Sequence, residues 1–113
     1  MGIYSQGSAQ LNTGAQIPLI GLGTAAVNQN EEEIKAAIAA ALQVGYRHFD
    51  TASSYNSEHA LGEALKTAFQ TEVVTRDDVF VTTKLSNKNH DDPVAALKTS
   101  LKYDFSIIVR DAY

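Results

Sequence analysis

Three polar residues of the sequence, Asp50, Tyr55 and Lys84, carry side chains that can move or stabilise a proton. A tyrosine in water has a pKa of about 10, which is too high for a ready proton donor and acceptor near neutral pH. A nearby ammonium group stabilises the phenolate and lowers that pKa, while a carboxylate keeps the ammonium charged and oriented. A set of Tyr, Lys and Asp is therefore suited to protonating an alkoxide as a hydride arrives at a carbonyl.

Each of these residues also has an ordinary structural interpretation. A tyrosine in a loop is usually a packing residue, a lysine at the end of a strand is usually solvated, and an aspartate there often caps a turn. The chemical interpretation holds only if the fold brings Asp50, Tyr55 and Lys84 to one place. Positions 50 and 84 are separated by about one βαβ repeat, so two neighbouring parallel strands would do this.

The clearest of the elements that must position these residues is a helix that begins near Glu31. Asn30 and Glu33 have the spacing of a capping box, and Gly45 stands where a left-handed C-terminal cap is needed. Between them, apolar residues recur every four positions, at 34, 38 and 42. This pattern predicts an amphipathic helix over about 31–44.

Strand and helix patterns alternate along the rest of the sequence. An Asn/Gly turn at 12–14 predicts a hairpin that ends at Pro18, followed by a short apolar run at 19–24. Further strands are predicted at 46–50 and 79–84, helices from about Ser57 and from Pro93 with Asp92 as its cap, and a possible last strand at 105–109. The apolar faces of these two helices are expected to consist of Leu61, Leu65, Ala68 and Phe69, and of Val94, Leu97 and Leu101.

This alternation predicts an α/β fold with a parallel sheet built from βαβ units. Right-handed crossovers place the carboxyl ends of such strands on one rim, where α/β proteins bind ligands. In this arrangement Asp50 closes the second strand, Tyr55 follows in its loop, and Lys84 closes the third. The three residues are therefore expected to meet at the rim.

The run at 21–26 offers a competing interpretation, because it fits G-x-G-x-x-A and Asp50 ends the next strand, as in a Rossmann dinucleotide fingerprint. That fingerprint requires the last small residue to open the helix whose N-terminus receives the pyrophosphate. Here the predicted helix begins about five residues later, and its first turn, Glu31 to Glu33, would repel a phosphate. The structural alternative is that Gly21 and Gly23 only allow a tight exit from the strand.

Four blocks of the sequence, in order from about Leu11 to Lys102, resemble the aldo-keto reductase superfamily. They are L-N-T-G and I-P-L-I-G-L-G-T within 11–24, G-Y-R-H-F-D-T-A-S-S-Y at 45–55, L-G-E-A-L at 61–65, and R-D-D-V-F-V-T-T-K-L at 76–85. The second and fourth blocks contain positions that are catalytic in that family. The resemblance implies a (β/α)8 TIM-type barrel that binds NADPH at its carboxyl-end rim and reduces aldehydes or ketones to alcohols.

Carried over residue by residue, the resemblance assigns a role to each candidate. Tyr55 would be the general acid and base, Lys84 would lower its pKa, and Asp50 would pair with Lys84 near the nicotinamide ribose. Gly23, Thr24 and Ala25 occupy the position of the family's cofactor-contacting loop. Together with Asp50, they are the expected cofactor-binding residues.

The sequence also departs from the family pattern. A (β/α)8 barrel needs about 250 residues, whereas this chain has 113. The family's further catalytic His, expected after a fourth strand, has no counterpart because no His follows His90, and Ser86 stands where many relatives have an aromatic pocket residue. We expect residues 1–113 to be a single partial domain, the truncated N-terminal part of the barrel, with a divergent tail at 103–113.

On this interpretation the 113 residues alone would be inactive, and they would be poorly folded or self-associate through unpaired sheet edges. The alternative function, from a different class, is that of a non-catalytic truncated isoform. It would bind a partner protein through the same exposed strand edges.

Composition and charge exclude several other classes of function. The chain has 9 Lys+Arg against 13 Asp+Glu, a net charge of −4, and no basic run that could neutralise the phosphates of nucleic acid or a membrane. It has no cysteine, which excludes thiol chemistry and favours a cytoplasmic location. His48, His59 and His90 share no metal-ligand spacing, so we expect no metal site. The expected partner is a small carbonyl substrate.

Overall fold

The structure is a computed structural model that describes residues 7–25 and 28–104 of the chain. Its strands are β1 (Ser8–Gln10), β2 (Gln16–Pro18), β3 (Leu22–Gly23), β4 (His48–Asp50) and β5 (Phe80–Thr82). Its helices are α1 (Glu31–Val44), α2 (Glu58–Gln70) and α3 (Pro93–Asp104), with single 3₁₀ turns η1 (Ser53–Tyr55), η2 (Arg76–Asp78) and η3 (Asn87–Asn89). The strand predicted at 105–109 lies outside the described residues.

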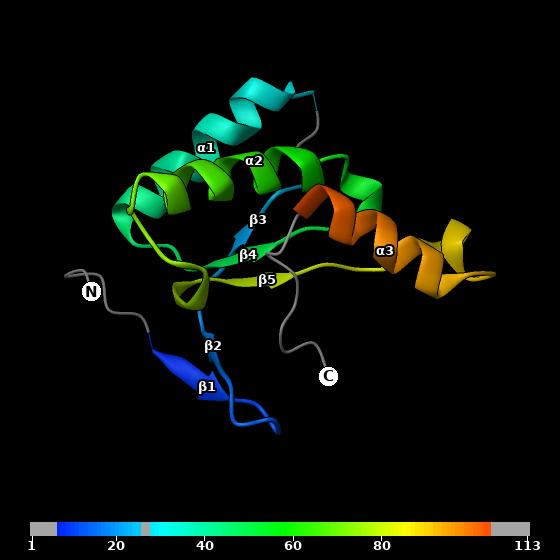
Figure 1. The fold of residues 1–113 in the computed structure, drawn as a ribbon, viewed down its shortest axis with the longest axis horizontal. Helices are drawn as coiled ribbons and strands as arrows, with labels where there is room; N and C mark the ends of the chain where they lie inside the picture. The colour runs from blue at the N-terminus through cyan, green and yellow to red at the C-terminus, as the bar shows by residue number, and fades with distance from the viewer. Residues whose placement is uncertain (1–6, 26–27, 105–113) are drawn as a thin grey trace.

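The predicted parallel sheet is confirmed. Strands β3, β4 and β5 lie in that order and all pairs are parallel, with Phe49 of β4 opposite Leu22 on one side and Val81 on the other. Helices α1 and α2 cover one face of this sheet, and α3 packs against α2 (Figure 1). The carboxyl ends of the three strands therefore point to one rim.

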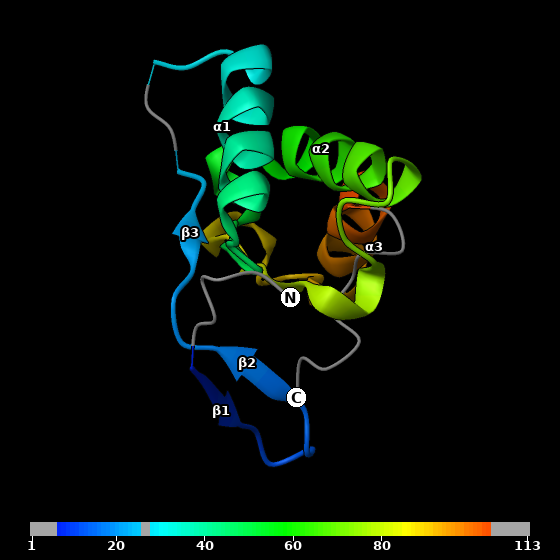
Figure 2. The same cartoon turned by 90° about the vertical axis from the view of Figure 1, so that its left-hand side faces the viewer.

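The predicted hairpin is also confirmed and forms a separate small sheet. Strands β1 and β2 pair antiparallel, and Figure 2 shows them away from α1 and α2, on the other side of the three-stranded sheet. His48 of β4 connects the two sheets, because its Nδ1 lies 3.3 Å from the Pro18 carbonyl and its Nε2 3.1 Å from the Thr82 hydroxyl. The hairpin is thereby held at the amino-terminal side of the sheet, away from the rim.

A side chain at position 21 would be crowded by His48. A Cβ there would lie 3.1 Å from the imidazole of His48 and 3.3 Å from the His48 carbonyl oxygen. The helix that follows begins only at Glu31 and carries three glutamates in its first turn. Both observations favour the strand-exit interpretation of Gly21 over a Rossmann fingerprint, since the helix that would receive a pyrophosphate begins only at Glu31, behind three glutamates.

Helix α1 follows its local sequence signals closely. The Asn30 side chain accepts from the Glu33 amide at 2.8 Å, the Glu33 carboxylate accepts from the Asn30 amide at 3.2 Å, and Gly45 has φ of 110°. Its buried face packs with that of α2 and with Phe49 and Val81 of the sheet, and the largest fully buried side chains of this core are Phe49, Ile38, Leu61 and Leu65. The core thus lies between the two helices and the sheet, directly beneath the rim.

The expected apolar face of α3 is not buried in the described structure. Val94 is 60% exposed and Leu97 48% exposed, whereas Ser100 is only 4% exposed. The Ser100 hydroxyl donates to the carboxylate of Glu58 in α2 at 3.1 Å, so the Ser100 side of α3 faces α2. The predicted helix and its Asp92 cap are confirmed, since the Ala95 amide donates to the Asp92 carboxylate at 3.1 Å, and the described residues leave the face with Val94 and Leu97 uncovered.

Candidate active site

The three strand ends that carry the candidate residues lie side by side at the rim. Asp50 is the last residue of β4, Thr24 directly follows β3, and their main chains are joined because the Thr24 amide donates to the Asp50 carbonyl at 2.9 Å. Lys84 does not close β5 as predicted but lies two residues beyond Thr82. The chain continues beside β4 there, since the Ser53 amide donates to the Lys84 carbonyl at 3.3 Å. Lys84 therefore still reaches the rim.

Tyr55 is returned to the rim by a tight turn. It ends η1, its amide donates to the Ala52 carbonyl at 3.0 Å, and the next residue, Asn56, has a left-handed φ of 56°. Asparagine tolerates this backbone conformation better than most residues. Helix α2 begins two residues later, so Tyr55 is fixed between the end of β4 and the start of a helix.

The Lys84 ammonium is the centre of the site. It contacts the Asp50 carboxylate, donates to the Thr51 carbonyl at 2.9 Å, and lies 3.5 Å from the Tyr55 hydroxyl. It is also 5.0 Å from the centroid of the Tyr55 ring. The structure thus brings together all three residues that the sequence singled out for proton chemistry.

Burial and charge act in opposite directions on Lys84. Burial lowers the pKa of its ammonium, but the hydrogen bond and charge of Asp50, with a smaller effect from Tyr55, raise that pKa above its ordinary value of 10.5. A raised folded-state pKa means that the contribution of this pair to stability is complete at neutral pH. It is lost only as the pH rises past 10.5 and through the raised pKa.

We expect Asp50→Asn to lower the pKa of Lys84, because burial remains while the largest raising influence is removed. An NMR titration of the lysine side-chain carbons measures this change. Lys35 of α1 is an internal control, because its own pKa is raised by Glu32, a partner on the same helix, and should not move. An unchanged Lys84 titration in Asp50→Asn would show that the carboxylate does not hold the ammonium.

The expected cofactor residues surround the end of β3. Gly23 is exposed, and a Cβ built on it would meet no atom within 4 Å. Ala25 is also exposed, but Thr24 is buried, and its hydroxyl donates to the Asp50 carbonyl at 3.0 Å rather than pointing to open space. Gly23 and Ala25 therefore border free space beside Asp50, and Thr24 supports the main chain beneath them.

Two further residues, Thr51 and Ser57, contribute to the site although their types did not single them out in the sequence. Thr51 binds Lys84 through its main-chain carbonyl, which no side-chain pattern reveals. Ser57, considered only as the start of a helix, is fully buried and hydrogen-bonds both Thr24 and Thr51. The sequence signal that could have pointed to Ser57 is its position two residues after the candidate catalytic Tyr55.

Residues 19–104 match the model of the aldo/keto reductase family. The chain belongs to this family. Among curated proteins, it is 45% identical over 92 residues to the NADP-dependent D-sorbitol-6-phosphate dehydrogenase of Malus domestica. The matched segment covers 81% of this chain and 29% of that relative. It is 48% identical over 92 residues to the glycerol 2-dehydrogenase (NADP(+)) of Saccharomyces cerevisiae, and this match covers 81% of this chain and 28% of that relative.

Solved structures of aldo/keto reductases agree with the fold. The Bombyx mori enzyme AKR2E4 in complex with NADP superposes with a TM-score of 0.80 at 40% identity, covering 88% of this chain and 34% of that one. The described residues are thus the N-terminal part of a (β/α)8 barrel, as predicted. The chain spans about three tenths of the length of the curated relatives that it matches.

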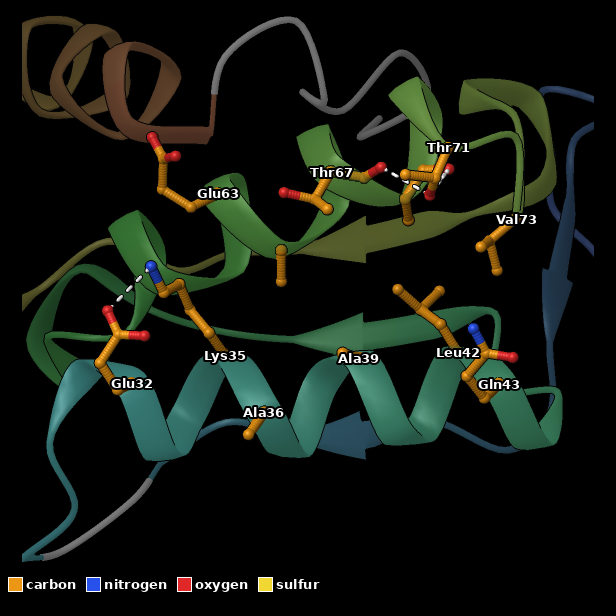
Figure 3. Close-up of a pocket in the computed structure, with 12 residues that line it drawn as sticks. Glu32, Lys35, Ala36, Ala39, Leu42, Gln43, Glu63, Thr67, Thr71 and Val73 are labelled. Atoms are coloured by element: carbon orange, nitrogen blue, oxygen red, sulfur yellow. Dashed lines mark hydrogen bonds and ion pairs between the residues drawn. The ribbon is translucent and has the colours of Figure 1, made fainter.

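A cavity in this aldo/keto reductase chain lies away from the rim, between α1 and α2. It has a volume of about 350 Å³, and Figure 3 shows Lys35 and Glu63 at one end and Leu42, Gln43 and Val73 at the other. None of its lining residues is at the carboxyl ends of the strands. The cavity therefore belongs to the outer, helical side of the fold rather than to the candidate active site.

Metal-ligating clusters and membrane-spanning helices are both absent from residues 7–25 and 28–104. That part of the chain contains no group of three or more His, Cys, Asp or Glu side chains able to hold a metal ion. It also contains no helix whose length and apolar character would let it cross a membrane.

Proposed function

We propose that this chain supplies the N-terminal part of an NADPH-dependent carbonyl reductase site, in which Tyr55 is the proton donor. The observation that supports this best is the position of the Lys84 ammonium, in contact with the Asp50 carboxylate and 3.5 Å from the Tyr55 hydroxyl. The strand ends that hold these groups also belong to the family segment matched at 19–104. The reaction is the reduction of an aldehyde or ketone to an alcohol.

The residues at the rim fit a bound nicotinamide cofactor. The free space above Gly23 and Ala25 adjoins Asp50, so a nucleotide can approach the main chain there without meeting a side chain. The names of the Malus domestica and Saccharomyces cerevisiae relatives include NADP, and the Bombyx mori structure is of a complex with NADP. When bound, NADPH would supply the hydride, and Gly23, Thr24, Ala25 and Asp50 would form part of its binding surface.

The chain's own residues divide the proton chemistry among them. The Tyr55 hydroxyl gives its proton to the substrate oxygen as that oxygen gains negative charge. The Lys84 ammonium, which is charged at neutral pH, stabilises the phenolate left on Tyr55. Asp50 and the Thr51 carbonyl hold Lys84 in place. This division gives Asp50 two proposed roles, one toward the lysine and one beside the cofactor.

A chimera tests this function. Residues 1–102 are joined to the part of Bombyx mori AKR2E4 that follows its matched segment, and we call this protein the completed reductase. We expect it to oxidise NADPH in the presence of a broad aldehyde such as 4-nitrobenzaldehyde. We expect no turnover from the 113 residues alone, because they span only about three tenths of the curated relatives.

Two results would contradict these expectations. A folded completed reductase that binds NADPH but reduces no carbonyl would remove the proposed function. Steady turnover by the pure 113-residue chain would show that the remaining barrel is unnecessary. Mass spectrometry of each preparation excludes contamination by a full-length enzyme.

Exposed features favour a second candidate, that of a module which pairs with another protein. In the described part of the chain, β3 and β5 are the outer strands of the sheet, and Leu85 next to the site is 45% exposed. Size-exclusion chromatography with and without a full-length relative tests this, because a partner role requires a defined complex. A single partial domain with a divergent tail at 103–113, and a cytoplasmic location, stay predictions from the sequence.

A further inference from the structure

Beneath the rim, three buried hydroxyl groups form a continuous set of hydrogen bonds. The Ser57 hydroxyl lies 2.7 Å from that of Thr24 and 3.0 Å from that of Thr51. Ser57 and Thr51 are 0% exposed and Thr24 is 4% exposed. We call these residues the hydroxyl chain. It joins the end of β3, the end of β4 and the start of α2.

The three hydroxyl groups of the hydroxyl chain are partners of one another. The Thr24 hydroxyl lies 3.0 Å from the Asp50 carbonyl, which also accepts from the Thr24 amide at 2.9 Å. Ser57 bonds the Thr24 and Thr51 hydroxyls together, and either atom of each pair can be the donor. In both directions Ser57 is the shared partner of the two threonines, so loss of its hydroxyl takes a hydrogen bond from each of these buried groups.

The hydroxyl chain connects every part of the candidate active site. Its two ends are the main chain of Asp50 and the residue whose carbonyl binds the Lys84 ammonium. Its middle member, Ser57, lies two residues after Tyr55 and so fixes the far end of the tyrosine turn. The Ser57 side chain links the Tyr55 turn to the residues that follow both β3 and β4.

We infer that Ser57 is a positioning residue that sets the place of Tyr55 relative to Lys84 and Asp50. The effect of Ser57 on catalysis rests on the proposed function. The hydrogen bonds that tie Ser57 to Thr24 and Thr51 do not depend on it. Loss of the Ser57 hydroxyl removes a hydrogen-bond partner of the buried Thr51 hydroxyl and frees the turn from Thr24. Tyr55 then samples positions from which proton transfer is slower.

The test uses Ser57→Ala in the completed reductase, alone and combined with Tyr55→Phe. We expect Ser57→Ala to lower kcat about tenfold when Tyr55 is present, and by less than about twofold in the Tyr55→Phe background, since there is no hydroxyl left to position. A residue with only a structural role would lower kcat by the same factor in both backgrounds, and this result would overturn the inference. If Tyr55→Phe itself leaves kcat unchanged, the proposed function fails instead.

Further variants separate positioning from stability. Thr51→Val removes the buried hydroxyl that loses its Ser57 partner in Ser57→Ala, so the double variant should regain thermal stability while kcat stays about tenfold low. Recovery of kcat together with stability would overturn the inference. The control is Ser100→Ala, which deletes a similarly buried serine hydroxyl bonded to Glu58. It should lower stability and leave kcat unchanged.

Hydrogen exchange gives a reading that needs no turnover. In Ser57→Ala we expect the amide of Tyr55, which donates to Ala52, to exchange about tenfold faster. The amide of Phe80, which donates to Arg47 at the opposite end of the sheet, should not change. Equal exchange of Tyr55 in both proteins would overturn the structural link, whatever the activity of the enzyme.

Discussion

Tyr55→Phe in the completed reductase is expected to lower kcat by about 10²–10⁴-fold, the usual contribution of a general acid. The substitution removes the hydroxyl that lies 3.5 Å from the Lys84 ammonium and leaves the ring in place. Affinity for NADPH should change little, because the hydroxyl is proposed to face the substrate oxygen. Steady-state kinetics for kcat and a fluorescence titration with NADPH measure the two quantities.

Tyr46→Phe is the matched control for this experiment. Tyr46 is half-buried and packs against the core rather than at the rim, so its variant should keep the parent kcat. A Tyr55→Phe enzyme with parental kcat would require another proton donor. The interpretation of this rim as an active site would then lose its main support.

Lys84→Met in the completed reductase is expected to lower kcat by about 10²–10³-fold, as the loss of a group that stabilises developing charge does elsewhere. Methionine keeps much of the side-chain volume but removes the ammonium that contacts Asp50 and Tyr55. The alkaline limb of the pH–rate profile should move to higher pH, because a phenolate forms less readily without a neighbouring positive charge. Rates measured from pH 6 to 10 test both effects.

Lys35→Met serves as the control for Lys84→Met. Lys35 lies on α1 and pairs with Glu32, on the helical side of the fold. Its variant should leave the rate and its pH dependence as in the parent. If Lys84→Met lowered kcat without moving the alkaline limb, Lys84 would act by holding structure rather than by its charge.

Local signals made much of the fold predictable from the sequence. The capping box at Asn30 and the glycine at position 45 determine where α1 begins and ends, and both signals lie in the residues at the helix ends themselves. The alternation of strand and helix patterns likewise predicts the parallel sheet, and hence that Asp50 and Lys84 share a rim. These features depend on residues close in sequence or on general rules of topology.

Features that depend on contacts between distant residues were not predictable. The hydrogen bond from Ser100 of α3 to Glu58 of α2 joins residues that lie 42 positions apart. The Thr51 carbonyl and the Ser57 hydroxyl matter through their positions and not through their residue types. In the same way, Thr24 fits the family's cofactor loop by its place in the sequence, but its side chain supports Asp50 from below.

The short span of sequence that carries Asp50, Tyr55 and Lys84 has a consequence for biosynthesis. Asp50 and Lys84 are 34 residues apart, and one helical crossover separates them. A ribosome that adds about 5–20 residues per second would deliver Lys84 only about 2–7 seconds after Asp50. The pairing of β4 with β5 can therefore bring the carboxylate, the phenol and the ammonium together during translation. Assembly of these three groups does not have to wait for any strand encoded later in the message.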